Sequence, residues 1–158
     1  MSIDELVEGV LNQKRRYLAR LISLIEDEDI QAMEALSQLY KHTGKGHIIG
    51  VTGPPGSGKS SLVTKLTAEF RTRSKTIGII CVDPSSPFTG GALLGDRIRM
   101  QEHSLDDEVY VRSMGTRGHL GGLARATSDA VRAVDAFGKD IIFVETVGTG
   151  QSEVEVVD

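Results

Sequence analysis

The sequence predicts an α/β fold, in which helices flank a mainly parallel β-sheet and an amino-terminal helical hairpin precedes it. From residue 47 onward, short apolar runs alternate with longer helical stretches, which is the rhythm of repeated β-α-β units. Before residue 44, apolar residues recur at three- and four-residue intervals, which is helical spacing. We therefore expect a helical extension over residues 1–44, followed by an α/β domain over residues 45–158.

The two helices of the expected hairpin are predicted from their ends. Ser2 and Glu5 have the spacing of a capping box, in which each side chain binds the other's free backbone amide. A polar break at 12–16 interrupts the apolar pattern of this first helix. The second helix is expected to start at Asp27 or Asp29, because aspartate accepts hydrogen bonds from the first free amides of a helix.

In the α/β part, apolar runs predict strands and the stretches between them predict helices. The expected strands are His47–Thr52, Thr76–Val82, Val109–Ser113 and Asp140–Thr146, and the expected helices are Gly58–Arg73, Gly95–His103 and Gly121–Phe137. Right-handed crossovers between parallel strands place the ends of all four strands along one edge of the sheet. Ligands of α/β proteins bind at this edge, so we look for functional residues there.

Composition and charge exclude several classes of protein. The chain is 39% hydrophobic and 25% charged, which is typical of a soluble globular domain. Its net charge of −4 leaves no bulk basic field to hold nucleic acid or an anionic membrane surface. The apolar runs are far shorter than the roughly 20 residues of a transmembrane helix. The single cysteine excludes an intrachain disulfide. We expect a protein of the cytoplasm, or of an organelle after removal of a leader, that binds neither nucleic acid nor a membrane.

The strongest motif is a phosphate-binding loop. Residues 53–60 read G-x-x-x-x-G-K-S, directly after a predicted strand and before a predicted helix. Its glycines let backbone amides gather around a phosphate, and the helix presents its positive end to the same anion. Lys59 would bind the outer phosphates, and the Ser60 hydroxyl would ligate a bridging Mg²⁺. The predicted nucleotide-binding residues are Gly53, Pro54, Pro55, Gly56, Ser57, Gly58, Lys59, Ser60 and Ser61.

Acidic residues at the same edge are candidates for the metal site, because Mg²⁺ prefers oxygen ligands. Asp83 follows one predicted strand, and Glu145 follows another and opens an acid-x-x-Gly element that ends at Gly148. Asp96 lies between them, in a segment flanked by glycines. Each acid could instead cap a strand end or a helix. The predicted metal ligands are Ser60, Asp83, Asp96 and Glu145.

Two further glycine-rich loops, residues 115–122 and 148–152, follow predicted strands at this edge. Loops of this composition can reorder when a γ-phosphate arrives. Arg117 and His119 could serve nucleotide charge or a partner protein, or could be ordinary exposed loop residues. Gln151 is a candidate for orienting the attacking water.

Five segments together resemble the MeaB/MMAA/ArgK family of P-loop GTPases, which are chaperones of adenosylcobalamin-dependent acyl-CoA mutases, chiefly methylmalonyl-CoA mutase. The segments are 53–60, 82–87, 90–100, 112–118 and 145–153. The resemblance implies Mg²⁺ as cofactor, GTP as substrate, GDP as product and a γ-phosphate sensor at Gly148. Lys59, Glu145 and Gly148 would then act in catalysis. The resemblance further implies that nucleotide state gates cofactor loading and protects the mutase, with the cobalamin bound by the mutase.

The family continues beyond the segments seen here, with an Asn-Lys-x-Asp element that reads guanine and a dimerising helical arm. We therefore expect a truncated P-loop NTPase fold, and a homodimer for the full-length form. Slow unaided GTP hydrolysis is expected, because no residue is assured for orienting water. Two alternatives stay open. One is a small-molecule kinase or ATPase with Arg97, Arg99 and Arg117 in mobile lids, and the other is an interaction module that hydrolyses nothing.

Overall fold

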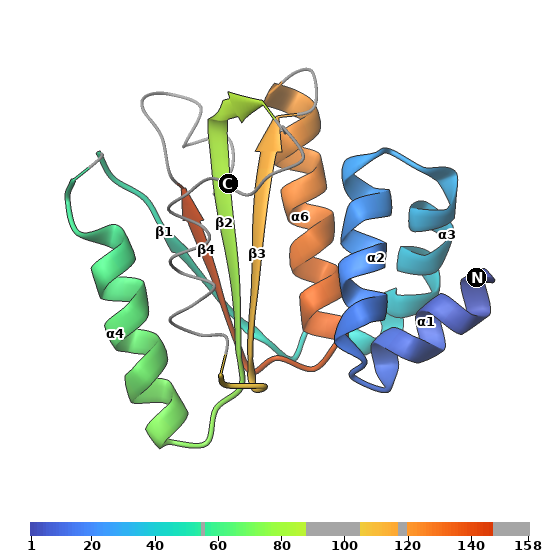
Figure 1. The fold of residues 1–158 in the computed structure, drawn as a ribbon. Helices are drawn as coiled ribbons and strands as arrows, with labels where there is room; N and C mark the ends of the chain where they lie inside the picture. Colours follow the sequence, from blue (N-terminus) through green and yellow to red (C-terminus); the bar gives the residue numbers. More distant parts are fainter. Residues whose placement is uncertain (55, 88–104, 117–119, 147–158) are drawn as a thin grey trace.

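The computed structural model describes residues 1–54, 56–87, 105–116 and 120–146. Within these ranges, four parallel strands form one sheet in the order β1-β4-β2-β3 (Figure 1). The strands are β1 (His47–Val51), β2 (Ile77–Pro87), β3 (Val109–Thr116) and β4 (Ile141–Thr146). All four lie where the sequence predicts a strand, and the parallel pairing places their carboxyl ends at one edge, as expected.

Helices cover both faces of the sheet. Helix α4 (Lys59–Thr72) lies against one face, and α6 (Leu120–Ala136) lies against the other (Figure 1). Both helices match their predicted ranges within two residues. The expected helix Gly95–His103 lies outside the described residues.

The amino-terminal part contains three α-helices rather than the two of the expected hairpin. They are α1 (Ile3–Leu11), α2 (Arg15–Glu26) and α3 (Ile30–Leu39), followed by the 3₁₀ turn η1 (Tyr40–His42). The hairpin prediction is wrong because the polar break ends the first helix: Gln13 has a φ of 56° and turns the chain into α2. The capping box is confirmed, since the Glu5 amide donates to Ser2 Oγ at 3.1 Å. Asp29 is the cap of α3 and accepts from the Gln31 amide at 2.9 Å.

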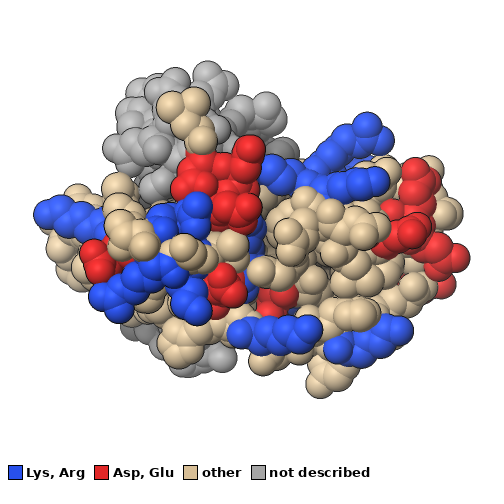
Figure 2. Space-filling model, turned by 90° about the horizontal axis from the view of Figure 1, so that it is seen from below, with Lys and Arg blue, Asp and Glu red and all other residues tan. Residues whose placement is uncertain are grey.

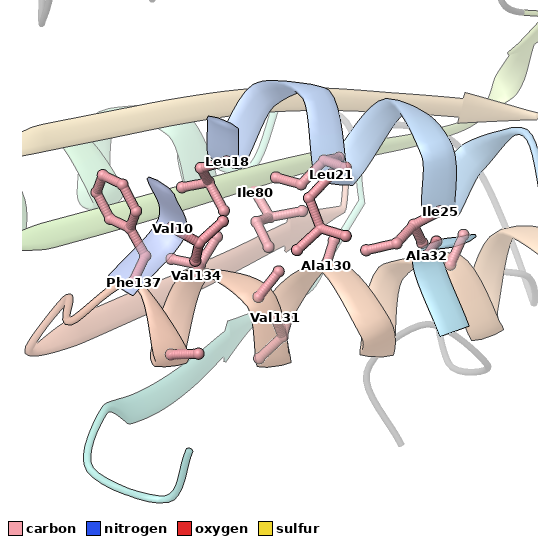
Figure 3. Packing of buried hydrophobic residues seen from close by; sticks show 14 of the residues in the cluster. Val10, Leu18, Leu21, Ile25, Ala32, Ile80, Ala130, Val131, Val134 and Phe137 are labelled. Carbon is pink, nitrogen blue, oxygen red and sulfur yellow. The ribbon is translucent and has the colours of Figure 1, made fainter. Parts of the chain in front are cut away.

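The three helices pack on the outer side of α6, and their apolar faces close one continuous core. Leu18, Leu21 and Ile25 of α2 belong to one core with Ala130 and Val134 of α6, which lie between the two helices (Figure 3). Burial of one such leucine contributes about 2 kcal/mol. A second core lies between the sheet and α4. The division into two units at residue 44 stays a prediction, although the first core spans it.

Asp135 on α6 fixes the connection between the helical extension and β1. Its carboxylate accepts hydrogen bonds from the amides of Gly44 at 2.6 Å, Lys45 at 3.3 Å and Gly46 at 2.8 Å. Asp135 is buried, and the three amides supply the partners that its charge requires. A Cβ at Gly46 would lie 2.9 Å from the Lys139 carbonyl oxygen, so a larger residue would push the connection away.

The lower face of the molecule carries mixed charge. Figure 2 shows lysine and arginine side chains interspersed with aspartate and glutamate, rather than gathered into a patch of one sign. Arg71 and Asp106 form an ion pair at 2.8 Å, and the Arg71 hydrogen bond lowers the pKa of Asp106. Burial also lowers the pKa of Lys139, which lies before β4 at the same end of the sheet as Asp106.

None of the described helices combines the length and apolarity that crossing a bilayer requires.

Candidate functional site: a phosphate loop and a serine–glutamate pair

The loop between β1 and α4 turns on glycines with left-handed backbone angles. Gly56 has a φ of 77° and Gly58 a φ of 90°, a region that side-chain-bearing residues rarely adopt. Gly58 immediately precedes α4 and is its N-cap. Because the first amides of a helix have no intrahelical acceptor, this end of α4 has the backbone form that suits an anion. The local structure therefore has the form that the motif predicts.

Lys59 folds back over the loop. Its Nζ donates to the carbonyl oxygen of Gly53, in a very short contact, and to that of Pro54 at 3.2 Å. The ammonium is thus held at the mouth of the loop by neutral carbonyl groups. A phosphate entering the loop would offer charged oxygens instead, and hydrogen bonds to charged acceptors are about twice as strong.

Ser60 and Glu145 meet at the same edge of the sheet. Ser60 is the second residue of α4 and Glu145 lies near the end of β4, yet Ser60 Oγ donates to Glu145 Oε1 at 2.7 Å. Glu145 is only 1% exposed. Beside it, Thr146 Oγ1 lies 3.5 Å from Thr52 Oγ1, so β4 is also tied to the residue that precedes the loop. A buried carboxylate therefore faces the loop on a fixed scaffold.

Asp83 lies on the neighbouring strand. In the sheet register Cys81 of β2 is level with Glu145, and Asp83 follows two residues later on the same face of the sheet. Asp83 is partly buried. The strand ends therefore bring Asp83 close to the pair formed by Ser60 and Glu145, as diagonal neighbours of a sheet face.

The other predicted site residues lie outside the described residues. These are Pro55, Asp96 and Gly148, together with Arg97, Arg99, Arg117, His119 and Gln151. Within the described ranges, no group of three or more histidine, cysteine, aspartate or glutamate side chains converges on one metal position. The metal roles of Ser60, Asp83 and Glu145 stay predictions. Their donor atoms nevertheless fit Mg²⁺, because hydroxyl and carboxylate oxygens are the ligands it prefers.

Two relationships in the structure are not predicted from the sequence. Arg112 on β3 binds Glu26 on α2 and donates to Ser23 Oγ at 3.1 Å, so a nearly buried ion pair joins the helical extension to the sheet. Ser113, the next residue, is level with Cys81 and therefore in line with Glu145. Both residues lie in the segment 112–118 that the sequence analysis names. Strand alternation alone does not show which residues of other helices and strands lie beside their side chains.

The parallel sheet, the glycine loop and the helix that follows it define a P-loop nucleotide-binding protein. Residues 18–158 match the family described as "Methylmalonyl Co-A mutase-associated GTPase MeaB", and the chain belongs to this family. The resemblance predicted from the sequence is therefore confirmed.

Curated relatives agree with this assignment. A Pyrococcus abyssi protein with the provisional name of GTPase is 57% identical over 155 residues, which are 98% of this chain and 48% of that protein. A "Probable GTPase" of Mycobacterium tuberculosis is 40% identical over 161 residues, which cover 99% of this chain and 48% of that protein. A "Methylmalonic aciduria type A homolog, mitochondrial" of Caenorhabditis elegans is 36% identical over 172 residues, which cover 99% of this chain and 43% of that protein. The chain spans about half the length of these relatives.

The fold also matches a solved structure, that of a protein named LAO/AO transport system kinase. The TM-score is 0.75 at 25% sequence identity, over 98% of this chain and 46% of that protein. The predicted P-loop fold class is thereby confirmed.

Proposed function

We propose that this chain is the nucleotide-binding part of a Mg²⁺-dependent GTPase that serves as a chaperone for an adenosylcobalamin-dependent acyl-CoA mutase of the methylmalonyl-CoA mutase type. The observation that carries the proposal is the 2.7 Å hydrogen bond between Ser60 and Glu145. It brings a hydroxyl and a carboxylate from distant segments to the mouth of the phosphate loop. P-loop GTPases need oxygen ligands at this position.

The residues of the chain would act by positioning and by charge. The loop amides and Lys59 would hold the β- and γ-phosphates, and the lysine would neutralise the charge that builds up during phosphoryl transfer. Ser60 and Asp83 would hold a bound Mg²⁺, which supplies further charge neutralisation. Glu145 would orient water beside the γ-phosphate, with Gly148 as sensor of that phosphate. Hydrolysis would follow in-line attack by water, and turnover would be slow without a partner.

The partner proposal rests on names carried by the relatives. The family description calls its members mutase-associated, and the C. elegans relative is named for methylmalonic aciduria. We infer that the nucleotide state of this chain gates cofactor loading of the mutase, which itself binds the cobalamin. The full-length protein would act as a homodimer in the cytoplasm.

Nucleotide titration tests the proposal. Isothermal titration of GTP, GDP, ATP and ADP, each with and without Mg²⁺, is expected to show tight nucleotide binding that requires the metal. Lys59→Ala should abolish tight triphosphate binding, because the phosphates lose their closest cation. Lys65→Ala removes an exposed lysine of the same helix and should leave binding unchanged. Equal affinity of the Lys59 variant and the wild type would refute the proposal.

The kinase alternative has one observation in its favour, the match to a protein named LAO/AO transport system kinase. It requires an acceptor for the γ-phosphate. Incubation with γ-labelled GTP distinguishes the two: release of the label as inorganic phosphate supports the GTPase, and its appearance on a metabolite supports the kinase. Retention of the label on unhydrolysed nucleotide, despite binding, would support a non-hydrolysing interaction module.

A further inference from the structure

The hydroxyl group of Ser113 is buried at the candidate site without a hydrogen-bond partner. Across the parts of the chain that the structure describes, its Oγ finds no donor or acceptor. Buried hydroxyl groups in folded proteins are nearly always paired with protein atoms or ordered water, because an unpaired one costs free energy. The Ser113 hydroxyl therefore needs a partner other than the described protein atoms, and an ordered water molecule is the usual one.

Ser113 faces the same side of the sheet as the candidate site. Val109 and Val111, four and two residues earlier on β3, belong to the core between the sheet and α4. Strand alternation places Ser113 on this side too. Ser113 is level with Cys81 of β2, which is in turn level with Glu145 of β4. Ser113, Cys81 and Glu145 thus form one row across β3, β2 and β4, with the Ser113 hydroxyl at one end and the Glu145 carboxylate at the other.

Among the predicted metal residues that the structure describes, Asp83 is the one on the strand next to Ser113. Asp83 is level with Gly115, two residues beyond Ser113 on the same strand. With strands about 4.8 Å apart and a rise of about 3.3 Å per residue, such diagonal neighbours of a parallel pair lie about 8 Å apart at their Cα atoms. The two side chains make no direct hydrogen bond, since Ser113 Oγ has none within the described ranges, but this separation suits one water molecule between them. A water with a hydroxyl and a carboxylate as partners is adequately bonded.

Three other side chains in the described residues also carry a buried polar atom of this kind, those of Thr67, Arg112 and Glu26. Arg112 and Glu26 bind each other through their other atoms, on the opposite side of the sheet from Ser113. Thr67 is buried about two turns along α4 from Ser60. Ser113 alone of these four lies at the level of the candidate site.

We propose that Ser113 is a positioning residue of the Mg²⁺ site, whose hydroxyl holds the Asp83 carboxylate through one bridging water. This inference rests on the proposed function. Carboxylates that ligate metals are usually held by further hydrogen bonds, and loss of such a partner weakens metal affinity about 10–100-fold. Valine occupies the two preceding inward positions of β3 and favours strands more than serine does. Serine at 113 therefore interrupts the apolar pattern of this face at the level of the candidate site.

The test compares Ser113→Ala with Ser113→Thr, which keeps the hydroxyl. Two quantities are measured on the full chain: the Tm without nucleotide, and the Mg²⁺ concentration that gives half-maximal binding of fluorescent GDP. Ser113→Ala is expected to raise the half-saturating Mg²⁺ concentration about tenfold, because the Asp83 carboxylate loses its water-mediated partner. The Tm without nucleotide should change little, because alanine removes the buried hydroxyl together with its need for a partner. Ser113→Thr should restore the wild-type Mg²⁺ value. Ser37→Ala, at an exposed position of α3, should change neither quantity.

The role of Asp83 is tested in the same assay. If Ser113 acts through Asp83, adding Ser113→Ala to Asp83→Asn should cause no further loss of Mg²⁺ affinity. The reason is that Asp83→Asn already removes the carboxylate that Ser113 would hold. Additive losses would overturn the proposed water bridge. A changed Tm with unchanged Mg²⁺ dependence would show a structural role only and would also overturn it. Absence of Mg²⁺-dependent nucleotide binding in the wild type would instead refute the proposed function.

Discussion

Ser60 and Glu145 are separated by 85 positions in the sequence, yet a 2.7 Å hydrogen bond joins their side chains. The contact depends on the parallel sheet, in which β1 and β4 are neighbours and end at the same edge. The helix that follows β1 carries Ser60 to this edge, and β4 carries Glu145. The hydroxyl group and the buried carboxylate therefore face each other beside the phosphate loop.

Substitution of Glu145 by glutamine should separate binding from hydrolysis. The amide oxygen can still accept the Ser60 hydrogen bond, so nucleotide affinity should change little. The lost charge should lower the hydrolysis rate about 10²-fold or more, which is typical for a residue that handles protons or orients water. Single-turnover hydrolysis and GDP titration measure the two effects. Glu69→Gln, at an exposed position of α4, is the control. Equal hydrolysis by the Glu145 variant and the wild type would remove Glu145 from the mechanism.

Gly58→Ala should damage the phosphate loop specifically. The φ of 90° at Gly58 is unfavourable for alanine by roughly 1–2 kcal/mol, and the loop would relax away from its phosphate-binding form. Gly44 is a matched control, because its φ is 89° and, as at Gly58, no atom lies within 4 Å of the position that a Cβ would take. Urea denaturation should show similar stability losses for the two variants. GDP affinity should fall only for Gly58→Ala, and an equal fall for both would contradict the assignment.

The ion pair between Arg112 and Glu26 should show strong coupling. Arg112→Met leaves a buried carboxylate without its cation and should lower the free energy of unfolding by about 3–5 kcal/mol. Adding Glu26→Met should restore most of this loss, because apolar pairs replace buried ion pairs well. The exposed pair of Arg73 and Glu69 is the control and should contribute less than about 1 kcal/mol. Additive effects of Arg112→Met and Glu26→Met in urea denaturation would contradict strong coupling.

Stability should fall at alkaline pH because of Tyr110. Burial raises its pKa from 10.0 to about 12, so the folded protein favours the neutral phenol. The contribution to stability is fully present below pH 10 and is lost as the pH rises through 12. Tyr110→Phe should therefore flatten the decline in unfolding free energy between about pH 10 and about pH 12. Tyr40→Phe, at a residue that is 70% exposed, should leave the decline as in the wild type.

The order of strands and helices in the α/β part can be predicted because each has a local signal. Apolar runs mark the strands, and the glycine-lysine-serine sequence marks the start of α4. The third amino-terminal helix is not predicted, because a polar break does not say whether the chain continues or reverses. The left-handed angle of Gln13 decides that question, and it depends on the packing of α1 against α2.

The candidate site is predictable to a similar degree. Strand ends place Glu145 and Asp83 at the correct edge, and the motif places Ser60 there. Strand alternation predicts that Arg112 and Ser113, adjacent on β3, face opposite sides, but the sequence does not show which side of the sheet each one faces. Nor does it show that Arg112 meets a glutamate 86 positions away. Such contacts follow from strand register and from the helix that covers each face.

A crystal structure with Mg²⁺ and a non-hydrolysable GTP analogue tests the central claim most directly. We expect phosphates within the loop formed by residues 53–60 and a metal ion about 2.1 Å from Ser60 Oγ, with the hydrogen bond to Glu145 exchanged for this ligation. Phosphates bound elsewhere, or a metal ion remote from Ser60 while that residue still binds Glu145, would contradict it.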